Sequence, residues 1–192
     1  QSRNQMVLDL SRDEVCEYVI NAVSDILANA NIEYVKWDMN RQLTDMPRLG
    51  YNHEYTLGYY KIMSAITEKF PNILFEGCSA GGGRFDAGVL AYMPQIWTSD
   101  NSDAIARLKM QYSTSMCYPV YSISSHVTAS PNHQCGRVTS LKTRADVAYC
   151  GTFGYELDVT KMSDEEFEEI KAQIKFEKRI QDLMCDGDLY RL

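Results

Sequence analysis

The sequence lacks an excess of basic residues. It has 19 Lys and Arg against 26 Asp and Glu, which gives a formal net charge of −7. Binding to a nucleic-acid backbone requires a basic face, so this charge argues against DNA or RNA as a partner. No apolar run approaches the roughly 20 residues of a membrane-spanning helix, and no apolar signal-peptide segment follows the polar residues 1–4. We therefore expect neither nucleic acid nor a membrane as a partner.

Closely spaced cysteine pairs are absent as well. The six cysteines form no Cys-x-x-Cys pair, and such scattered thiols are typical of a cytoplasmic protein. His133 and Cys135 lie close together, but no second pair of ligands stands at the spacing of a zinc site. We therefore expect a cytoplasmic location, no metal and no cofactor.

The sequence does contain a regular alternation of short apolar runs and helical patterns. Repeated units of this kind imply a parallel sheet covered by helices. Either an open doubly wound sheet or part of a (β/α)8 barrel fits, because six units and 192 residues fall short of the eight units and roughly 250 residues of a barrel. The predicted strands are 6–8, 32–37, 73–78, 94–97, 120–123 and 153–157, and the predicted helices are 15–30, 54–69, 84–91, 103–115, 140–149 and one from 163.

Helix-capping signals stand at three of these helices. Ser11 with Glu14, and Ser163 with Glu166, match the capping box. Asp103 stands at the start of another helix, where the helix dipole favours a carboxylate. Capping therefore explains Asp103 better than catalysis does.

The first candidate site follows the strand predicted over residues 32–37. Lys36 and Asp38 are two residues apart, so they point to the same side if the strand continues that far. The ammonium would keep Asp38 ionised, as a nucleophile requires. Trp37 and Asn40 add groups that suit a sugar. The alternative is a Lys–Asp pair that seals the end of the sheet.

Two further clusters follow other predicted strands. Asp100 stands where residues 94–97 leave the sheet, and from there a general acid could reach a leaving group; a structural role stays equally open. Cys78 precedes a glycine run whose spacing is neither a Walker loop nor a dinucleotide fingerprint. Glycines let backbone approach a ligand closely or form a tight turn. His126 and Glu76 are weaker candidates, because each has an equally good structural explanation.

Three motifs resemble those of glycoside hydrolase family 36, the bacterial α-galactosidases, and they occur in the same order on successive predicted strands. They are Lys36-Trp37-Asp38-Met39-Asn40-Arg41, Cys78-Ser79-Ala80-Gly81-Gly82-Gly83-Arg84-Phe85-Asp86 and Trp97-Thr98-Ser99-Asp100.

The resemblance implies a retaining α-galactosidase acting on terminal α-D-galactosides of the melibiose and raffinose type. Asp38 would be the nucleophile and Asp100 the acid/base, as in double displacement. An α-galactoside oligosaccharide is the implied partner, and the full-length protein would be a homo-oligomer, a tetramer. The expected substrate-binding residues are Lys36, Trp37, Asn40, Cys78 and Gly81.

The family resemblance also implies a (β/α)8 TIM barrel, with the nucleophile after strand four and the acid/base after strand six. Counting back, residues 6–8 correspond to strand three. Residues 1–192 would then be a partial catalytic domain covering roughly strands three to eight. The first two βα units, an N-terminal β-sandwich domain and a C-terminal β-domain would be absent from it.

Two alternatives stay open within this interpretation. An α-galactosyltransferase of raffinose-type sugars would share the chemistry until a sugar, rather than water, attacks the intermediate. A catalytically inactive scaffold or binding fragment would result if the missing strands are essential.

Overall fold

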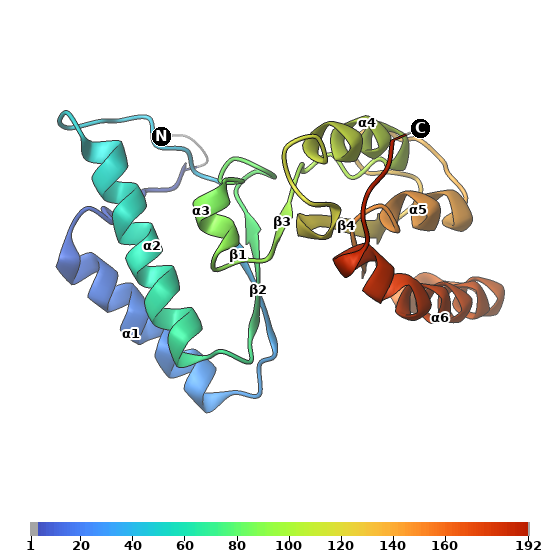
Figure 1. Cartoon of the computed structure of the whole chain (residues 1–192), viewed down its shortest axis with the longest axis horizontal. Helices are drawn as coiled ribbons and strands as arrows, with labels where there is room; N and C mark the ends of the chain where they lie inside the picture. Colours follow the sequence, from blue (N-terminus) through green and yellow to red (C-terminus); the bar gives the residue numbers. More distant parts are fainter. Residues whose placement is uncertain (1–3, 192) are drawn as a thin grey trace. The chain divides into compact units, whose positions relative to one another are not determined.

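The computed structural model describes residues 4–191 (Figure 1). It divides into two compact units, Gln1–Pro94 and Gln95–Leu192. Within each unit the paired strands run parallel and alternate with helices, which confirms the predicted α/β class. No helix in the described part is long and apolar enough to cross a membrane.

The first unit contains a pair of parallel strands. β1 and β2 are in register from Tyr34 opposite Leu74 to Asp38 opposite Cys78. The last residues of the two strands are therefore neighbours at one edge of the pair. In chain order the elements are α1 (Asp13–Asn29), β1 (Tyr34–Asp38), α2 (Tyr51–Lys69), β2 (Leu74–Cys78) and α3 (Ala87–Leu90).

Helix α2 supplies much of the apolar core of this unit and packs against α1. Gly58 lies at that contact, where a Cβ atom would stand 1.8 Å from the carbonyl oxygen of Leu10. The thiol of Cys16 donates to the same carbonyl at 3.2 Å. Five α2 side chains recur at helical spacing and are at most 5% exposed: Tyr55, Tyr59, Ile62, Met63 and Ile66.

The second unit has three parallel strands with β4 in the middle, paired with β3 on one side and β5 on the other. A buried apolar cluster that includes Val127, Ala145 and Ile170 joins β4, α5 and α6. The elements are β3 (Gln95–Trp97), α4 (Ala104–Thr114), the 3-10 helix η2 (Val120–Ser122), β4 (Ile123–Thr128), α5 (Leu141–Ala148), β5 (Thr152–Glu156), the 3-10 helix η3 (Val159–Lys161) and α6 (Asp164–Asp186).

A buried arginine connects α4 to the strands of the second unit. Arg107 is 3% exposed, and its guanidinium carbon lies 4.4 Å from the centre of the Trp97 ring. It donates to the carbonyl oxygens of Ser99, at 3.2 Å, and of Ser124. It also donates to the side chain of Gln111 at 3.1 Å. A buried charge needs such partners, and here they attach the segment after β3 to β4.

Two predictions at the start of the chain were wrong. Residues 6–8 form no strand, so residues 4–191 contain five strands rather than six. A strand requires hydrogen bonds to a neighbouring strand. The side chains of Met6 and Leu8 are instead 86% and 54% exposed, so the apolar pattern of residues 6–8 is not packed into a sheet. Ser11 and Glu14 form no capping box, because Arg12 occupies the N-cap position without a side-chain bond.

Two elements differ from their predicted ranges at a histidine. Residues 120–122 of the predicted strand 120–123 form a 3-10 helix and β4 continues to Thr128, so His126 lies inside a strand. α2 begins at Tyr51 and not at residue 54, so it includes His53. The predicted capping box of Ser163 and Glu166 is confirmed at the start of α6.

Candidate active site

Lys36, Asp38 and Cys78 lie on one face of the β1–β2 pair. Asp38 and Cys78 are direct register partners, and Lys36 stands opposite Glu76. Exposure along β1 alternates from residue to residue, as expected for a strand. Trp37 therefore points to the opposite face from Lys36 and Asp38.

The buried carboxylate of Glu76 has two partners on β1. Its Oε1 atom lies 3.5 Å from Nζ of Lys36, and the hydroxyl of Tyr34 donates to Oε2. The Glu76 side chain is completely buried, whereas that of Lys36 is 31% exposed. A carboxylate at such depth is stable only when it is paired, so Glu76 and Lys36 hold each other in place.

Asn40 links the end of β1 to the turn after β2. Its Nδ2 atom donates to Oδ2 of Asp38 at 2.6 Å, and its Oδ1 atom accepts from the backbone N–H of Ala80 at 2.8 Å. The hydroxyl of Ser79 adds a bond to the carbonyl of Met39 at 2.7 Å. The Asp38 carboxylate is therefore oriented by a side chain that is itself held by the glycine-rich turn.

The same turn encloses the thiol of Cys78. Gly81 has a φ of +80°, a region that favours glycine. Cys78 is 4% exposed, and burial raises the pKa of its thiol to about 11; the backbone N–H of Gly81 opposes this rise and the carboxylate of Asp38 adds to it. The thiol is therefore neutral at pH 7, which suits a hydrogen-bonding or packing role and not a thiolate nucleophile.

A cavity of about 440 Å³ opens beside this edge, a size typical of small-molecule sites. Arg84 lies on its wall, 4.7 Å from the centre of the Tyr59 ring, and donates to the carbonyl of Cys78 at 2.9 Å. The cavity lies on the side of β1 that carries Trp37 and faces α1 and α2, and Lys36, Cys78 and Gly81 do not line it. Its lining includes Leu10, Val19, Trp37, Asp38, Asn40, Tyr55, Tyr59, Ile62 and Arg84.

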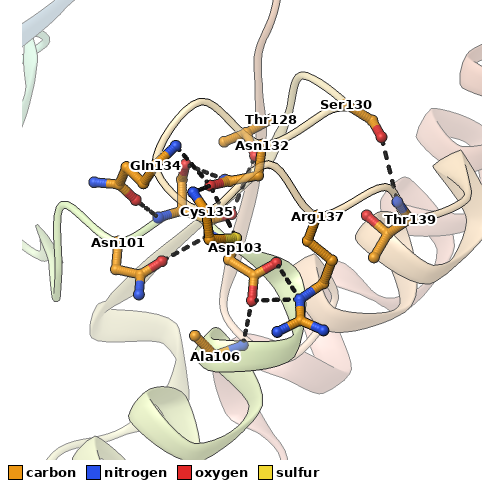
Figure 2. Close-up of polar contacts among 11 residues, drawn as sticks. Asn101, Asp103, Ala106, Thr128, Ser130, Asn132, Gln134, Cys135, Arg137 and Thr139 are labelled. Carbon is orange, nitrogen blue, oxygen red and sulfur yellow. Dashed lines mark hydrogen bonds and ion pairs between the residues drawn. The ribbon is translucent and has the colours of Figure 1, made fainter.

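Asp100 and Asp103 follow β3 in the second unit and have different environments. The side chain of Asp100 is exposed in the segment between β3 and α4. Asp103 is 3% exposed and accepts from the N–H of Ala106 at 3.0 Å. It also accepts from Nε of Arg137 at 3.1 Å (Figure 2). Asp103 thus caps α4, which confirms its predicted structural role.

The loop after β4 binds the segment that carries Asp100. The side-chain amide of Gln134 contacts the backbone of both Asp100 and Ser102, and Asn132 donates to the hydroxyl of Ser102 at 3.1 Å. At the end of β4, Thr128 donates to the carbonyl of Ser102 at 3.1 Å. Sequence gave no local signal for these contacts, because they join segments about thirty residues apart.

The structure thus brings Lys36, Asp38, Asn40, Cys78 and Gly81 together in the first unit, while Asp100 belongs to the second.

His126 of the second unit contacts an aromatic ring and a carboxylate. The rings of His126 and Trp97 are tilted by 31° with centres 4.8 Å apart, and Nδ1 of His126 lies 3.6 Å from Oε2 of Glu156. Among residues 4–191, no group of three His, Cys, Asp or Glu side chains is placed to hold a metal ion. This result applies to His133 and Cys135 as well.

Comparison with known proteins gives matches over the whole chain. The model of the family described as Melibiase matches residues 1–187. Over 200 residues the chain is 53% identical to alpha-galactosidase AgaA of Geobacillus stearothermophilus, covering 100% of this chain and 27% of that protein. The chain therefore spans about a quarter of the length of this relative.

Solved structures of AgaA variants match the fold. One, in complex with raffinose, has a TM-score of 0.94 at 52% identity and covers 100% of this chain and 28% of its own. Another, in complex with stachyose, has a TM-score of 0.90 at 53% identity and covers 96% of this chain and 27% of its own. Each of these variants carries one substituted aspartate.

Proposed function

The chain belongs to the melibiase family, and we propose that it is part of the catalytic domain of an α-galactosidase that hydrolyses terminal α-D-galactosides. One observation carries this proposal: the carboxylate of Asp38 ends β1, is oriented by Asn40 at 2.6 Å, and shares a face with Lys36 and Cys78. The raffinose and stachyose complexes of AgaA support raffinose-type oligosaccharides as the substrate class.

The proposed architecture is a (β/α)8 barrel in which β1 to β5 are strands four to eight. Asp38 then follows strand four and Asp100 follows strand six, as the family pattern requires. High TM-scores over 96% or more of the chain support this proposal. The remaining barrel units and the two β-domains would come from other parts of a full-length protein. Its cytoplasmic location and tetrameric state stay predictions.

The proposed mechanism is double displacement with retention of configuration. Asp38 attacks the anomeric carbon while Asp100 protonates the leaving oxygen, and Asp100 then deprotonates the water that releases galactose. Asn40 keeps the carboxylate of Asp38 aligned. Lys36, Cys78 and Gly81 are the remaining proposed sugar contacts, and a neutral Cys78 thiol can donate to a hydroxyl or pack against the ring. Trp37, which was also predicted as a contact, lies on the opposite face of β1 and is not proposed to contact the same sugar.

The role of Asp38 is tested in the full-length protein that contains this chain. We expect Asp38→Asn to bind raffinose but to lose hydrolysis by at least about 10³-fold, because the nucleophile is gone. Azide should restore turnover of Asp38→Gly by forming galactosyl azide. Asp25→Asn, at an exposed position of α1, is the matched control and should keep full activity. Near-normal hydrolysis by Asp38→Asn contradicts the proposal.

Two assays separate the alternatives. Product analysis at high sucrose distinguishes hydrolysis from galactosyl transfer, since only transfer makes new raffinose-type sugars. Comparing the 192-residue chain with the full-length protein on an aryl α-galactoside shows whether these residues are active alone.

A further inference from the structure

We propose that Gln134 is a positioning residue for Asp100; the inference rests on the proposed acid/base role of Asp100. Gln134 lies in the loop after β4, 34 positions from Asp100 along the chain. Its Nε2 atom donates to the carbonyl of Asp100 at 2.6 Å, and its Oε1 atom accepts from the N–H of Ser102 at 3.0 Å. One side-chain amide thus holds the backbone at Asp100 and two residues beyond it.

Gln134 is itself held by a buried neighbour. Asn132 is 6% exposed, and its Oδ1 atom accepts from the backbone N–H groups of Gln134 and Cys135 at 3.0 and 3.2 Å. Its Nδ2 atom donates to the hydroxyl of Ser102 at 3.1 Å. Asn132 therefore fixes the loop that carries Gln134 against the segment that carries Asp100.

The residues on either side of Asp100 are attached independently. Arg107 holds the carbonyl of Ser99, and Thr128 holds the carbonyl of Ser102. Removing the Gln134 amide should therefore leave the segment in place and loosen the backbone at Asp100 itself. Asp100 stands between these two attachments, and small misplacements of a catalytic group reduce rates strongly.

This role has a kinetic consequence that a purely structural role lacks. Protonation by a general acid matters when the leaving group is a basic sugar oxygen, and it matters little for a weakly basic phenolate. A misplaced Asp100 should thus slow the first step for raffinose but not for an activated aryl galactoside. The quantity that reports this step is kcat/KM.

The test uses the full-length protein with raffinose and 2,4-dinitrophenyl α-galactoside. For Gln134→Ala we expect kcat/KM to fall about tenfold with raffinose and less than about twofold with the aryl galactoside. Gln181→Ala, at an exposed position of α6, is the control and should change neither. Equal losses on both substrates, or no loss, overturn the proposal.

Two further variants make the outcomes distinguishable. Gln134→Glu keeps an acceptor for Ser102 but places an oxygen against the carbonyl of Asp100, so it should show the same substrate-dependent loss; wild-type kinetics would overturn the proposal. Asp100→Ala tests the premise, because it should lose raffinose hydrolysis far more than aryl galactoside cleavage. If Asp100→Ala discriminates between the substrates and Gln134→Ala does not, the acid/base role stands and the positioning role fails. If Asp100→Ala does not discriminate, the proposed function fails as well.

Discussion

Alkylation of Cys78 should be slow at neutral pH, because its thiol lies in a buried site beside Asp38. The structure raises the pKa of this thiol from its ordinary value of 9.0 to about 11. At pH 8 the thiolate fraction then falls from about one in ten to about one in a thousand. Only the thiolate reacts, so the charge effect alone slows alkylation about 100-fold.

The assay is iodoacetamide labelling of the full-length protein between pH 7 and about pH 12, with each cysteine quantified by mass spectrometry. Burial also limits access of the reagent, which lowers the rate at every pH but leaves the midpoint unchanged. The midpoint is therefore the informative quantity, and we expect it near 11. The exposed Cys117 and Cys185 in the same sample confirm that the reagent is active.

Substitution of Asp38 separates the causes of this shift. Asp38→Asn removes a carboxylate that raises the pKa of Cys78, so the midpoint should move down toward 9 while burial keeps it above that value. Asp25→Asn should leave it unchanged. A wild-type midpoint near 9, or one that Asp38→Asn does not move, refutes the reasoning.

The raised pKa of Cys78 also makes stability depend on pH. Because folding favours the neutral thiol, the stability that this thiol contributes is complete below pH 9 and is lost as the pH rises through 11.

Two further predictions concern packing and charge. Gly58→Ala should lower the Tm, because the added Cβ atom would stand 1.8 Å from the backbone oxygen of Leu10. The gain of about 1 kcal/mol in helix propensity is outweighed by an overpacking cost of about 1–3 kcal/mol. Glu76→Gln keeps an acceptor for Tyr34 but removes the charge paired with Lys36, so KM for raffinose should rise about tenfold with a smaller change in kcat.

Each of these has a matched control. Asn52→Ala, at an exposed position of the same helix as Gly58, should not lower the Tm; a Gly58→Ala protein as stable as wild type would contradict the clash. Glu17→Gln removes an exposed ion pair with Lys61 and should leave the kinetics unchanged, since such pairs contribute little. An unchanged KM in Glu76→Gln would show that Lys36 does not depend on its partner.

Sequence alone was sufficient where the determining contacts are local. The Ser163 capping box and the Asp103 cap involve residues three apart on one helix start, so a short motif predicts them. The alternation of apolar runs and helical patterns predicted the parallel α/β class, because each run and each helical pattern is likewise local to its own segment. The two-residue spacing of Lys36 and Asp38 correctly placed both on one side of a strand.

Tertiary structure decided the contacts that depend on a partner far away in the chain. Residues 6–8 have a strand-like sequence but no ladder of hydrogen bonds, because a strand requires a neighbour as well as a pattern. Lys36 has Glu76 as its ion-pair partner only because β1 and β2 align in one particular register. Likewise, Gln134 reaches Asp100 only because the loop after β4 folds over the segment after β3. Local sequence thus determined which residues could do chemistry, and strand register and loop packing decided which groups hold them.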